Sequence, residues 1–201
     1  MAPRELFLGT TNKKKLSELV RLLSPLGFSL KTPEQMDANV DVEETGATFL
    51  ENACLKAAEQ ARFHQLFAIG EDSGLCVDAL QGAPGIYSAR FSGPEATDQS
   101  NNELLLEKMK AISMEKRTAH YVSTIALASP DGTILATAEG KCHGRILDNP
   151  RGIGGFGYDP LFEILEYHQT FAELGGTVKA CLSHRARALE KFIGQLKKLE
   201  L

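Results

Sequence analysis

The sequence has 201 residues, 43% of them hydrophobic and 24% charged, and a formal net charge of −4. This length suits one α/β domain, or two lobes that share a sheet, and is ample for a buried core. The acidic balance argues against a broad surface for nucleic acid or an anionic membrane. The four cysteines form no Cys-x-x-Cys pair, and neither a signal-peptide core nor a membrane-length apolar run is present. We therefore expect one cytoplasmic domain over residues 1–201, with no nucleic-acid or membrane partner.

The chain begins with a predicted strand over residues 6–8, which leads through a polar turn into a helix. Thr11 or Asn12 is a suitable cap for that helix, and the lysines at 13–15 open it. A strand, a polar turn and a helix start form a general phosphate site, because free backbone amides and the helix dipole favour an anion. Lysines oppose that dipole, so an anionic ligand would resolve the conflict. A solvated first turn is the alternative, and the glycine spacing of a Walker loop is missing.

A second helix is predicted to begin at the capping box Thr48–Glu51, after a weak strand and a loop. Asn52 and Lys56 lie one turn apart on a single face of this helix. Taken alone, surface exposure is the simpler interpretation of that pair. Glu43 and Glu44, just ahead of the helix, are candidates either for dipole partners or for metal ligands, and the sequence leaves both possibilities open.

The most informative stretch is 69–93, which is rich in glycine and acidic residues. Residues 66–69 predict a short buried strand, so Glu71 and Asp72 are expected side by side at its C-terminal end, where open α/β sheets place ligands. Ser73 adds a hydroxyl group. Adjacent carboxylates repel each other unless a cation or a proton offsets the charge. The glycines and proline that follow indicate a fixed irregular loop, and an ordinary acidic turn is the alternative interpretation.

A third helix capped by Asp98 and a β-hairpin over 118–146 come next. The hairpin is predicted from two β-branched runs around a Pro-Asp-Gly turn, with one packed and one more polar face. A second glycine-dense loop covers 149–162. It contains a formal G-x-G-x-x-G, but Asp-Pro follows it instead of a helix, which argues against a dinucleotide fingerprint. Phe156 could stack on a flat ring, and the carboxylate of Asp159 could accept hydrogen bonds from the edge of that ring or from a sugar. A packed turn is the alternative.

The last predicted helix begins after Ser183 and carries His184 and Arg185 in its first turn. These cations lie at the unfavourable end of the helix dipole, as the lysines do at 13–15. Such a repeated conflict between local charge and structure is expected at functional sites.

An ordered set of motifs that spans nearly the whole chain resembles the inosine triphosphate pyrophosphatase family. Each motif is weak alone, but their order is specific. The motifs are Thr10-x-Asn12-x-x-Lys15, Glu43–Gly46, Glu71–Gly74, Gly82–Gly85, Gly154–Asp159 and Ser183–Arg185.

The resemblance implies an elongated α/β fold with a long central mixed sheet flanked by helices, an active-site cleft between two lobes, and a homodimer. It also implies Mg²⁺-dependent hydrolysis of dITP, ITP and XTP, noncanonical purine nucleoside triphosphates, to the monophosphate and pyrophosphate. By motif, Asp72 would be the base for the attacking water, and metal ligands would come from Glu43, Glu44, Glu71 and Asp72. The implied substrate-binding residues are Thr10, Thr11, Asn12, Lys13, Lys14, Lys15, Lys56, Ser73, Phe156, Gly157, Tyr158, Asp159, Lys179, His184 and Arg185.

Arg185 and His184 can donate to the 6-oxo group of such purines but not to the amino group of adenine. The sequence departs from the family pattern at Glu71, where Asp is common, at Thr11, where Gly is frequent, and at 175–178, where acidic residues are usual. Two other functions stay open. One is a Maf-like pyrophosphatase for modified pyrimidine nucleotides, and the other is a nucleotide-binding regulator without catalysis.

Overall fold

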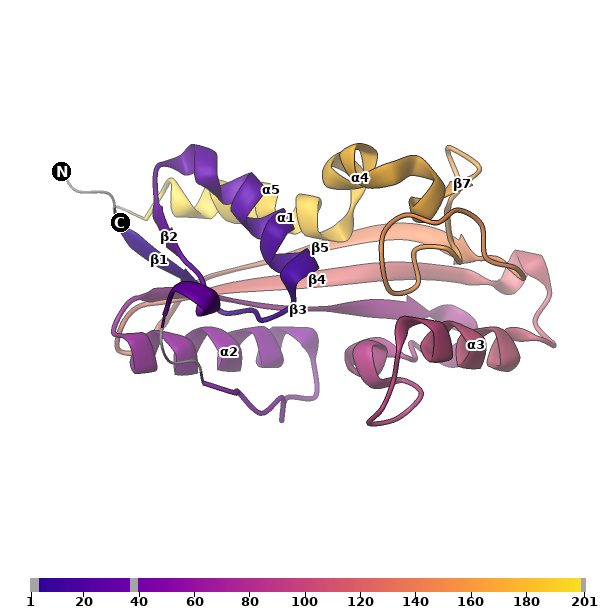
Figure 1. Cartoon of the computed structure of the whole chain (residues 1–201), viewed down its shortest axis with the longest axis horizontal. Coiled ribbons are helices and arrows are strands. Elements are labelled where there is room, and N and C mark those ends of the chain that lie inside the picture. The colour runs from indigo at the N-terminus through magenta and orange to yellow at the C-terminus, as the bar shows by residue number, and fades with distance from the viewer. Residues whose placement is uncertain (1–3, 37–39, 200–201) are drawn as a thin grey trace. The chain divides into compact units, whose positions relative to one another are not determined.

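The computed structural model describes residues 4–36 and 40–199, which form helices on a mixed β-sheet (Figure 1). The strands are β1 (Glu5–Leu8), β2 (Ser29–Lys31), β3 (Phe67–Val77), β4 (Thr118–Ala128), β5 (Ile134–Ile146), β6 (Phe162–Ile164) and β7 (Gln169–Thr170). Their order in the sheet is β2-β1-β3-β4-β5-β6-β7. β1 pairs in parallel with β2 and β3, whereas β6 is antiparallel to β5 and β7. The predicted α/β class with a mixed sheet is confirmed.

The longer helices are α1 (Lys13–Leu23), α2 (Phe49–His64), α3 (Asp98–Met109), α4 (Phe171–Leu182) and α5 (His184–Leu196). The chain divides into two compact units. The first comprises Met1–Asp72, Ser123–Gly140 and Arg185–Leu201, and the second comprises Ser73–Val122 and Lys141–His184. Within residues 4–36 and 40–199, no helix is long and apolar enough to cross a membrane.

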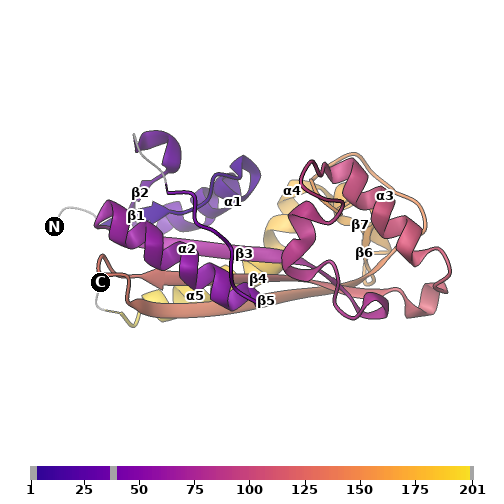
Figure 2. The same ribbon diagram turned by 90° about the horizontal axis from the view of Figure 1, so that it is seen from below.

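In the first unit, side chains alternate along β3 and so reach opposite faces of the sheet. Ala68 packs with buried alanines of α2, whereas Ile69 packs with leucines of α1 and α5. Figures 1 and 2 show α2 on one face of this part of the sheet and α1 and α5 on the other. The small residues bring α2 so close that a Cβ atom on Gly70 would lie 2.2 Å from the carbonyl oxygen of Ala53.

The predicted starts of α1 and α2 are confirmed. At both, a capping side chain accepts hydrogen bonds from backbone amides of the first turn. Asn12 caps α1, because its Oδ1 accepts from the backbone amides of Lys14 and Lys15, both at 3.1 Å. Thr48 and Glu51 form the predicted capping box of α2. Each cap satisfies amides that have no partner within the first helical turn.

The course of β3 corrects the prediction that the strand ends before Glu71. β3 continues as far as Val77, and Leu75 and Val77 are fully buried within the strand. β3 lies beside β4 in the sheet, so its backbone groups can pair there. Its polar side chains have buried partners of their own, so the strand can continue through them. Glu71 and Asp72 are therefore consecutive residues of one strand, and their side chains point to opposite faces.

The predicted hairpin of β4 and β5 is confirmed, with the amide of Ser129 donating to the carbonyl of Thr133 at 2.9 Å. β5 alternates between buried and exposed residues, as predicted. β4 does not, because helices cover both of its faces in the first unit. Ile125 packs with the cluster of α1 and α5, and Ala126 packs with that of α2.

The second unit is built around an aromatic cluster. Phe162 on β6 lies between Tyr121 on β4, with ring centroids 4.6 Å apart, and Phe171 on α4, at 5.7 Å. Apolar residues of α3 join the same core. The cap of α3 is Thr97, one residue before the predicted Asp98, because the Thr97 hydroxyl accepts from the amide of the third helical residue.

Candidate functional site

Asp72 lies on the face of β3 that α2 covers, and it is only 5% exposed. Asn52 Nδ2 donates to Asp72 Oδ2 at 3.3 Å, and Lys56 Nζ lies 2.9 Å from Oδ1. Glu44 Oε1 lies 2.6 Å from the same ammonium group. Asn52 is fully buried, so the simpler interpretation of surface exposure is wrong for it. The helical spacing of Asn52 and Lys56 instead points both side chains at one carboxylate.

The charges around Asp72 change its acidity. Burial raises the pKa of Asp72 above its ordinary value of 3.8, and the nearby Lys56 lowers it by less. Burial would lower the pKa of Lys56, but Asp72 and Glu44 raise it by more, so the ammonium stays charged. A carboxylate with a raised pKa is a stronger base, and such perturbed groups concentrate at functional sites.

Glu71 lies on the opposite face of β3, 2% exposed, within a buried ion cluster. Its Oε1 accepts from Ser123 Oγ at 2.9 Å and from Arg185 Nη2 at 3.1 Å, and Lys15 Nζ lies 3.1 Å from its Oε2. Glu18 on α1 accepts a hydrogen bond from Nη1 of Arg185. Two carboxylates and two cations leave this cluster without net charge.

Glu71 and Asp72 therefore have different partners, and a metal site that includes either of them stays a prediction. Burial alone would raise the pKa of Glu71, but Arg185 and Lys15 lower it by more, and it lies well below its ordinary value. On the other face, Asp72 and Glu44 both lie beside the ammonium group of Lys56, which brings two carboxylates close together. That face is the one on which a cation would relieve repulsion.

The carboxylates near Asp72 are too few to hold a metal ion by themselves, but their number suits Mg²⁺. Within residues 4–36 and 40–199, no three His, Cys, Asp or Glu side chains gather in a way that could hold a metal ion. Mg²⁺ commonly takes one or two carboxylates and completes its octahedron with phosphate oxygens and water. Asp72 and Glu44 supply such a pair of carboxylates. Glu43 is exposed to solvent.

The polar turn after β1 lies where the sheet topology favours ligands. β1 is central in the parallel order β2-β1-β3, with α1 and α2 on opposite faces, and ligands of open α/β sheets bind at such a switch point. Leu8 at the end of β1 pairs with Ile69, two residues before Glu71. The predicted free amides of Lys14 and Lys15 are already taken by Asn12. Side chains would therefore have to supply most of the anion-binding donors here.

The three lysines of this turn have different surroundings. Lys13 is exposed and pairs with Glu34 at 3.3 Å, and Lys14 is also exposed. Lys15 alone among them enters the Glu71 cluster, with 18% of its side chain exposed. The row of like residues therefore does not act as one basic patch.

In the second unit, the residues predicted to recognise a base form a separate cluster. Lys179 on α4 is 5% exposed and forms an ion pair with Asp159, which is 1% exposed. The Lys179 ammonium lies 4.1 Å from the ring centroid of Phe156, and Asp159 Oδ2 accepts from the Phe156 amide at 2.9 Å. Tyr158 is buried, and its hydroxyl donates to the carbonyl of Ser88 at 2.8 Å. The structure thus brings these predicted residues together.

His184 and Arg185 are consecutive but belong to different units. His184 is 4% exposed and stacks on Tyr121, with ring centroids 4.7 Å apart and an interplanar angle of 13°. Arg185 is 1% exposed and bonds to Glu71 and Glu18. Its conflict with the helix dipole is resolved by these carboxylates, so no ligand is needed to explain it. The arrangement gives no support to Arg185 as a direct donor to a base.

The other predicted residues lie at the edges of these clusters. Thr10 Oγ1 accepts from the amide of Asn12 at 3.3 Å, and Thr11 is exposed. Ser73 is half-buried on β3, and Gly157 adopts φ = 60° in the glycine-rich loop.

Two members of the Glu71 cluster, Glu18 and Ser123, were not predicted from the sequence. Glu18 could have been found, because it follows Lys15 by three residues and so shares its helix face. Ser123 carried no such indication, because its partner Glu71 lies 52 residues away in the chain.

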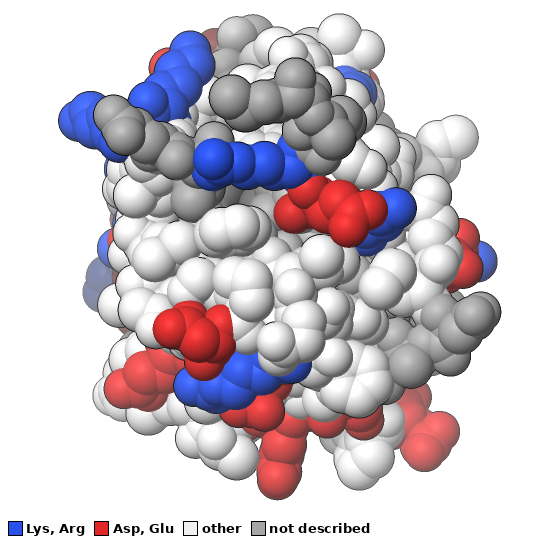
Figure 3. Space-filling view, turned by 90° about the vertical axis from the view of Figure 1, so that its left-hand side faces the viewer, with Lys and Arg blue, Asp and Glu red and all other residues white. Residues whose placement is uncertain are grey.

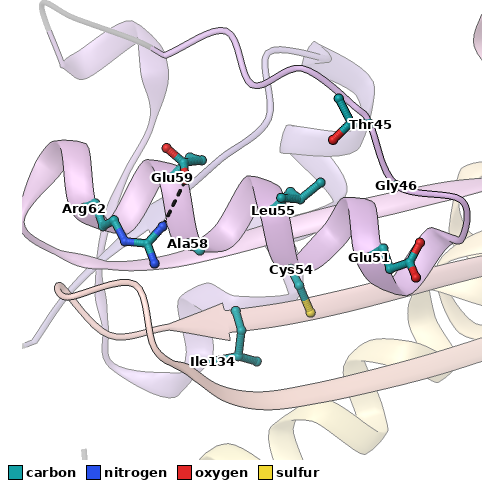
Figure 4. A pocket seen from close by; sticks show the side chains of 9 residues that line it. All are labelled: Thr45, Gly46, Glu51, Cys54, Leu55, Ala58, Glu59, Arg62 and Ile134. Carbon is teal, nitrogen blue, oxygen red and sulfur yellow. Dashed lines mark hydrogen bonds and ion pairs between the residues drawn. The ribbon is translucent and has the colours of Figure 1, made fainter.

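A hollow of about 520 Å³ lies beside α2 in the first unit (Figure 4). Its lining is mostly apolar and consists of Thr45, Gly46, Glu51, Cys54, Leu55, Ala58, Glu59, Arg62 and Ile134. Glu59 and Arg62 pair with each other at 2.9 Å, and burial raises the pKa of Cys54, which keeps its thiol neutral. The hollow therefore offers no reactive group.

Figure 3 shows one face of the charged surface. Lysines and arginines are interspersed there with acidic residues and broad uncharged areas.

Known proteins resemble this chain over nearly its whole length. The sequence profile of the Ham1 family matches residues 6–195. A dITP/XTP pyrophosphatase of Rhodopirellula baltica is 48% identical over 195 residues, which cover 97% of this chain and 94% of the relative. One from Thermus thermophilus is 50% identical over 186 residues, covering 92% and 88%.

Solved structures show the same fold. A HAM1 protein from Coxiella burnetii superposes with a TM-score of 0.89 at 36% identity, covering 97% of this chain and 99% of that one. The nucleoside-triphosphatase (dITP/XTP pyrophosphatase) of Mycobacterium abscessus gives a TM-score of 0.78 at 40% identity, covering 96% and 99%. The resemblance drawn from the ordered motifs is thereby confirmed. The chain belongs to the Ham1 family.

Proposed function

We propose that this protein hydrolyses noncanonical purine nucleoside triphosphates such as dITP, ITP and XTP to the monophosphate and pyrophosphate. The observation that carries the proposal is Asp72, a buried carboxylate of raised pKa that Asn52 and Lys56 hold in place. The relatives named dITP/XTP pyrophosphatase support this substrate class over modified pyrimidine nucleotides. They also support catalysis over a purely regulatory role.

Asp72 is the proposed general base. Its carboxylate orients a water molecule for in-line attack on phosphorus and takes the proton as the new bond forms. Asn52 fixes the orientation of the carboxylate through its 3.3 Å hydrogen bond. Lys56, which lies beside Asp72, is the proposed cation for the charge that develops on the pyrophosphate leaving group, whereas Lys15 is paired with Glu71 on the other face of β3.

Mg²⁺ is the proposed cofactor, and Asp72 and Glu44 are the residues that would hold it. Both carboxylates point at the same ammonium group of Lys56, so they already converge. When bound, a divalent ion offsets phosphate charge and makes water more acidic. Glu71 is left out of this ligand set, because Arg185 and Lys15 occupy its carboxylate.

Recognition of the base is proposed for the cluster of Phe156, Asp159 and Lys179. An aromatic ring can stack on a purine, and an ammonium group donates hydrogen bonds but cannot accept them. A 6-oxo group therefore suits Lys179, whereas the 6-amino group of adenine would set donor against donor. An unsatisfied donor in a buried site costs roughly 1–3 kcal/mol, which is about tenfold or more in selectivity.

The substitution Asp72→Asn tests the base. It keeps the shape of the side chain and should leave the binding of IMP and pyrophosphate largely intact, while turnover of dITP falls by orders of magnitude. Because the pKa of Asp72 is higher in the folded than in the unfolded state, its charge disfavours folding above that pKa. At pH 7 the variant should therefore be at least as stable as the wild type. Near-normal pyrophosphate release from dITP would end the assignment.

We also propose that the protein works as a homodimer in the cytoplasm. The free cysteines, Cys54, Cys76, Cys142 and Cys181, are compatible with a reducing compartment. Light scattering coupled to gel filtration measures the oligomeric state, and a monomeric mass at micromolar concentration would contradict the dimer.

A further inference from the structure

Helix α3 holds one residue of the glycine-rich loop from both sides. Asp98 Oδ2 accepts from the amide of Gly157 at 2.9 Å, and Asn102 Nδ2 donates to the carbonyl of the same Gly157 at 3.0 Å. Asp98 and Asn102 are four residues apart, so they lie on one face of the first turns of α3. Both polar groups of the Gly157 backbone are therefore fixed by a single rigid element.

This loop needs external support. Gly152, Gly155 and Gly157 all have positive φ, at 80°, 75° and 60°. Glycine has more backbone freedom than any other residue, so a segment with three such positions does not hold one conformation by itself. A Cβ atom placed on Gly157 would meet nothing within 4 Å, so neighbouring groups do not crowd that side of the residue. The hydrogen bonds from α3 supply the restraint that the local sequence lacks.

The held residue directly follows Phe156, the aromatic residue of the proposed base site. The Phe156 amide is bound by Asp159, and its ring lies 4.1 Å from the ammonium group of Lys179. With its own amide fixed by Asp159 and the next residue fixed by α3, Phe156 has a defined backbone on both sides. Asp98 and Asn102 both bond to the backbone of Gly157, so their effect on Phe156 would pass through the loop.

The same helix also holds the segment that contacts Tyr158. Asn101 Oδ1 accepts from the amide of Ser92 at 2.8 Å, and its Nδ2 donates to the carbonyl of Ala89 at 3.2 Å. The hydroxyl of Tyr158 donates to the carbonyl of Ser88 in that segment. The first turns of α3 thus anchor both the glycine-rich loop and the segment of the 3₁₀ helix Gly85–Arg90, which meet at Tyr158.

We propose that Asp98 and Asn102 are positioning residues for base recognition, which hold Phe156 in the orientation that binds a purine. This inference rests on the proposed function, because it assumes that Phe156 meets the base. It assigns to α3 a role in the affinity for the base and none in the chemistry at phosphorus.

The test separates the base from the polyphosphate by using as probes IMP, the monophosphate product of ITP, and pyrophosphate. Inhibition of dITP hydrolysis by IMP reports the base site, whereas inhibition by pyrophosphate does not. Asp98→Ala removes a charge-assisted hydrogen bond, so the affinity for IMP should fall about tenfold. Affinity for pyrophosphate should stay within about twofold. Asn102→Ala should shift IMP in the same direction by a smaller factor, because its bond is between neutral groups.

Two further variants control for a general loss of structure. Asp98→Asn keeps an oxygen that can accept from the Gly157 amide and should restore most of the IMP affinity. Gln99→Ala changes an exposed neighbour that bonds to Glu103 on the same helix, and it should leave both inhibition constants unchanged. Amide hydrogen exchange should show faster exchange at 155–158 in Asp98→Ala than in Gln99→Ala.

The failures are distinguishable. If the wild type does not hydrolyse dITP, the proposed function is refuted and this inference falls with it. If the wild type is active but Asp98→Ala changes the IMP and pyrophosphate constants equally, or neither, the positioning role alone is overturned. The same conclusion follows if Asp98→Asn behaves like Asp98→Ala.

Discussion

Replacing Glu71 with Gln is expected to destabilise this protein strongly at neutral pH. Glu71 is 2% exposed, and its carboxylate is the common partner of Arg185, Lys15 and Ser123. The amide of Gln would place a donor group against one of the two cations and leave Arg185 with Glu18 as its remaining carboxylate. Removing one member of a buried ion pair costs about 3–5 kcal/mol, because an uncompensated charge stays behind.

The loss is large compared with the total stability of a domain, about 5–15 kcal/mol. For a chain of this length each kcal/mol lowers Tm by about 2–4 °C, so Glu71→Gln should lower it by about 6–20 °C. Urea unfolding at pH 7 measures the free-energy difference directly. The matched control is Glu59→Gln, which breaks a half-exposed pair with Arg62 and should cost less than about 1 kcal/mol.

The pH dependence of the difference has a fixed sign. The pKa of Glu71 is lower in the folded state than its ordinary value of 4.5, so the ionised group stabilises the folded protein above pH 4.5. That contribution declines as the pH falls below 4.5 towards the folded-state pKa. The gap between wild type and Glu71→Gln should therefore be full at pH 7 and smaller at pH 3. A gap below about 1 kcal/mol at pH 7 would refute the buried-cluster reasoning.

Three other outcomes are expected. Because Asp72 must be ionised to act as a base and its pKa is raised, kcat/KM for dITP should fall in acid with a midpoint above pH 3.8; a midpoint at or below that value would count against Asp72. Gly70→Ala should push α2 away from β3 and lower the stability measured by thermal unfolding by at least about 1–3 kcal/mol. Turnover should also fall, because α2 carries Lys56, whereas wild-type stability would show that α2 can move without cost. Lys179→Met should leave Asp159 as an uncompensated buried charge and weaken IMP binding more than pyrophosphate binding in calorimetry, and equal weakening of both would contradict a role at the base.

Local sequence was enough for the elements whose start is encoded by one or two side chains. Asn12 and the capping box at Thr48 predicted the beginnings of α1 and α2, because a cap needs only residues within the same turn. The hairpin of β4 and β5 followed from its turn residues in the same way. The ordered motifs also located Asp72, Lys56 and Lys179, which the structure places in compact buried clusters.

Long-range packing decided what the local pattern left ambiguous. Glu71 and Asp72 look like one acidic pair in sequence, but β3 continues through them, and strand alternation sends them to different faces. Arg185 and Lys15 neutralise one carboxylate, and Lys56 and Asn52 hold the other. Which partners a strand residue meets depends on the helices packed on each face.

The sequence by itself therefore determined the residue types of the site, its family, and where most helices and strands begin. Only the tertiary structure decided that Glu71 lies in a buried ion cluster with Arg185 and Lys15, while Asp72 lies on the other face of β3 with Asn52 and Lys56. The physical reason is that charge compensation depends on distance in space. Glu71 and Arg185 are 114 residues apart in the chain and 3.1 Å apart in the fold.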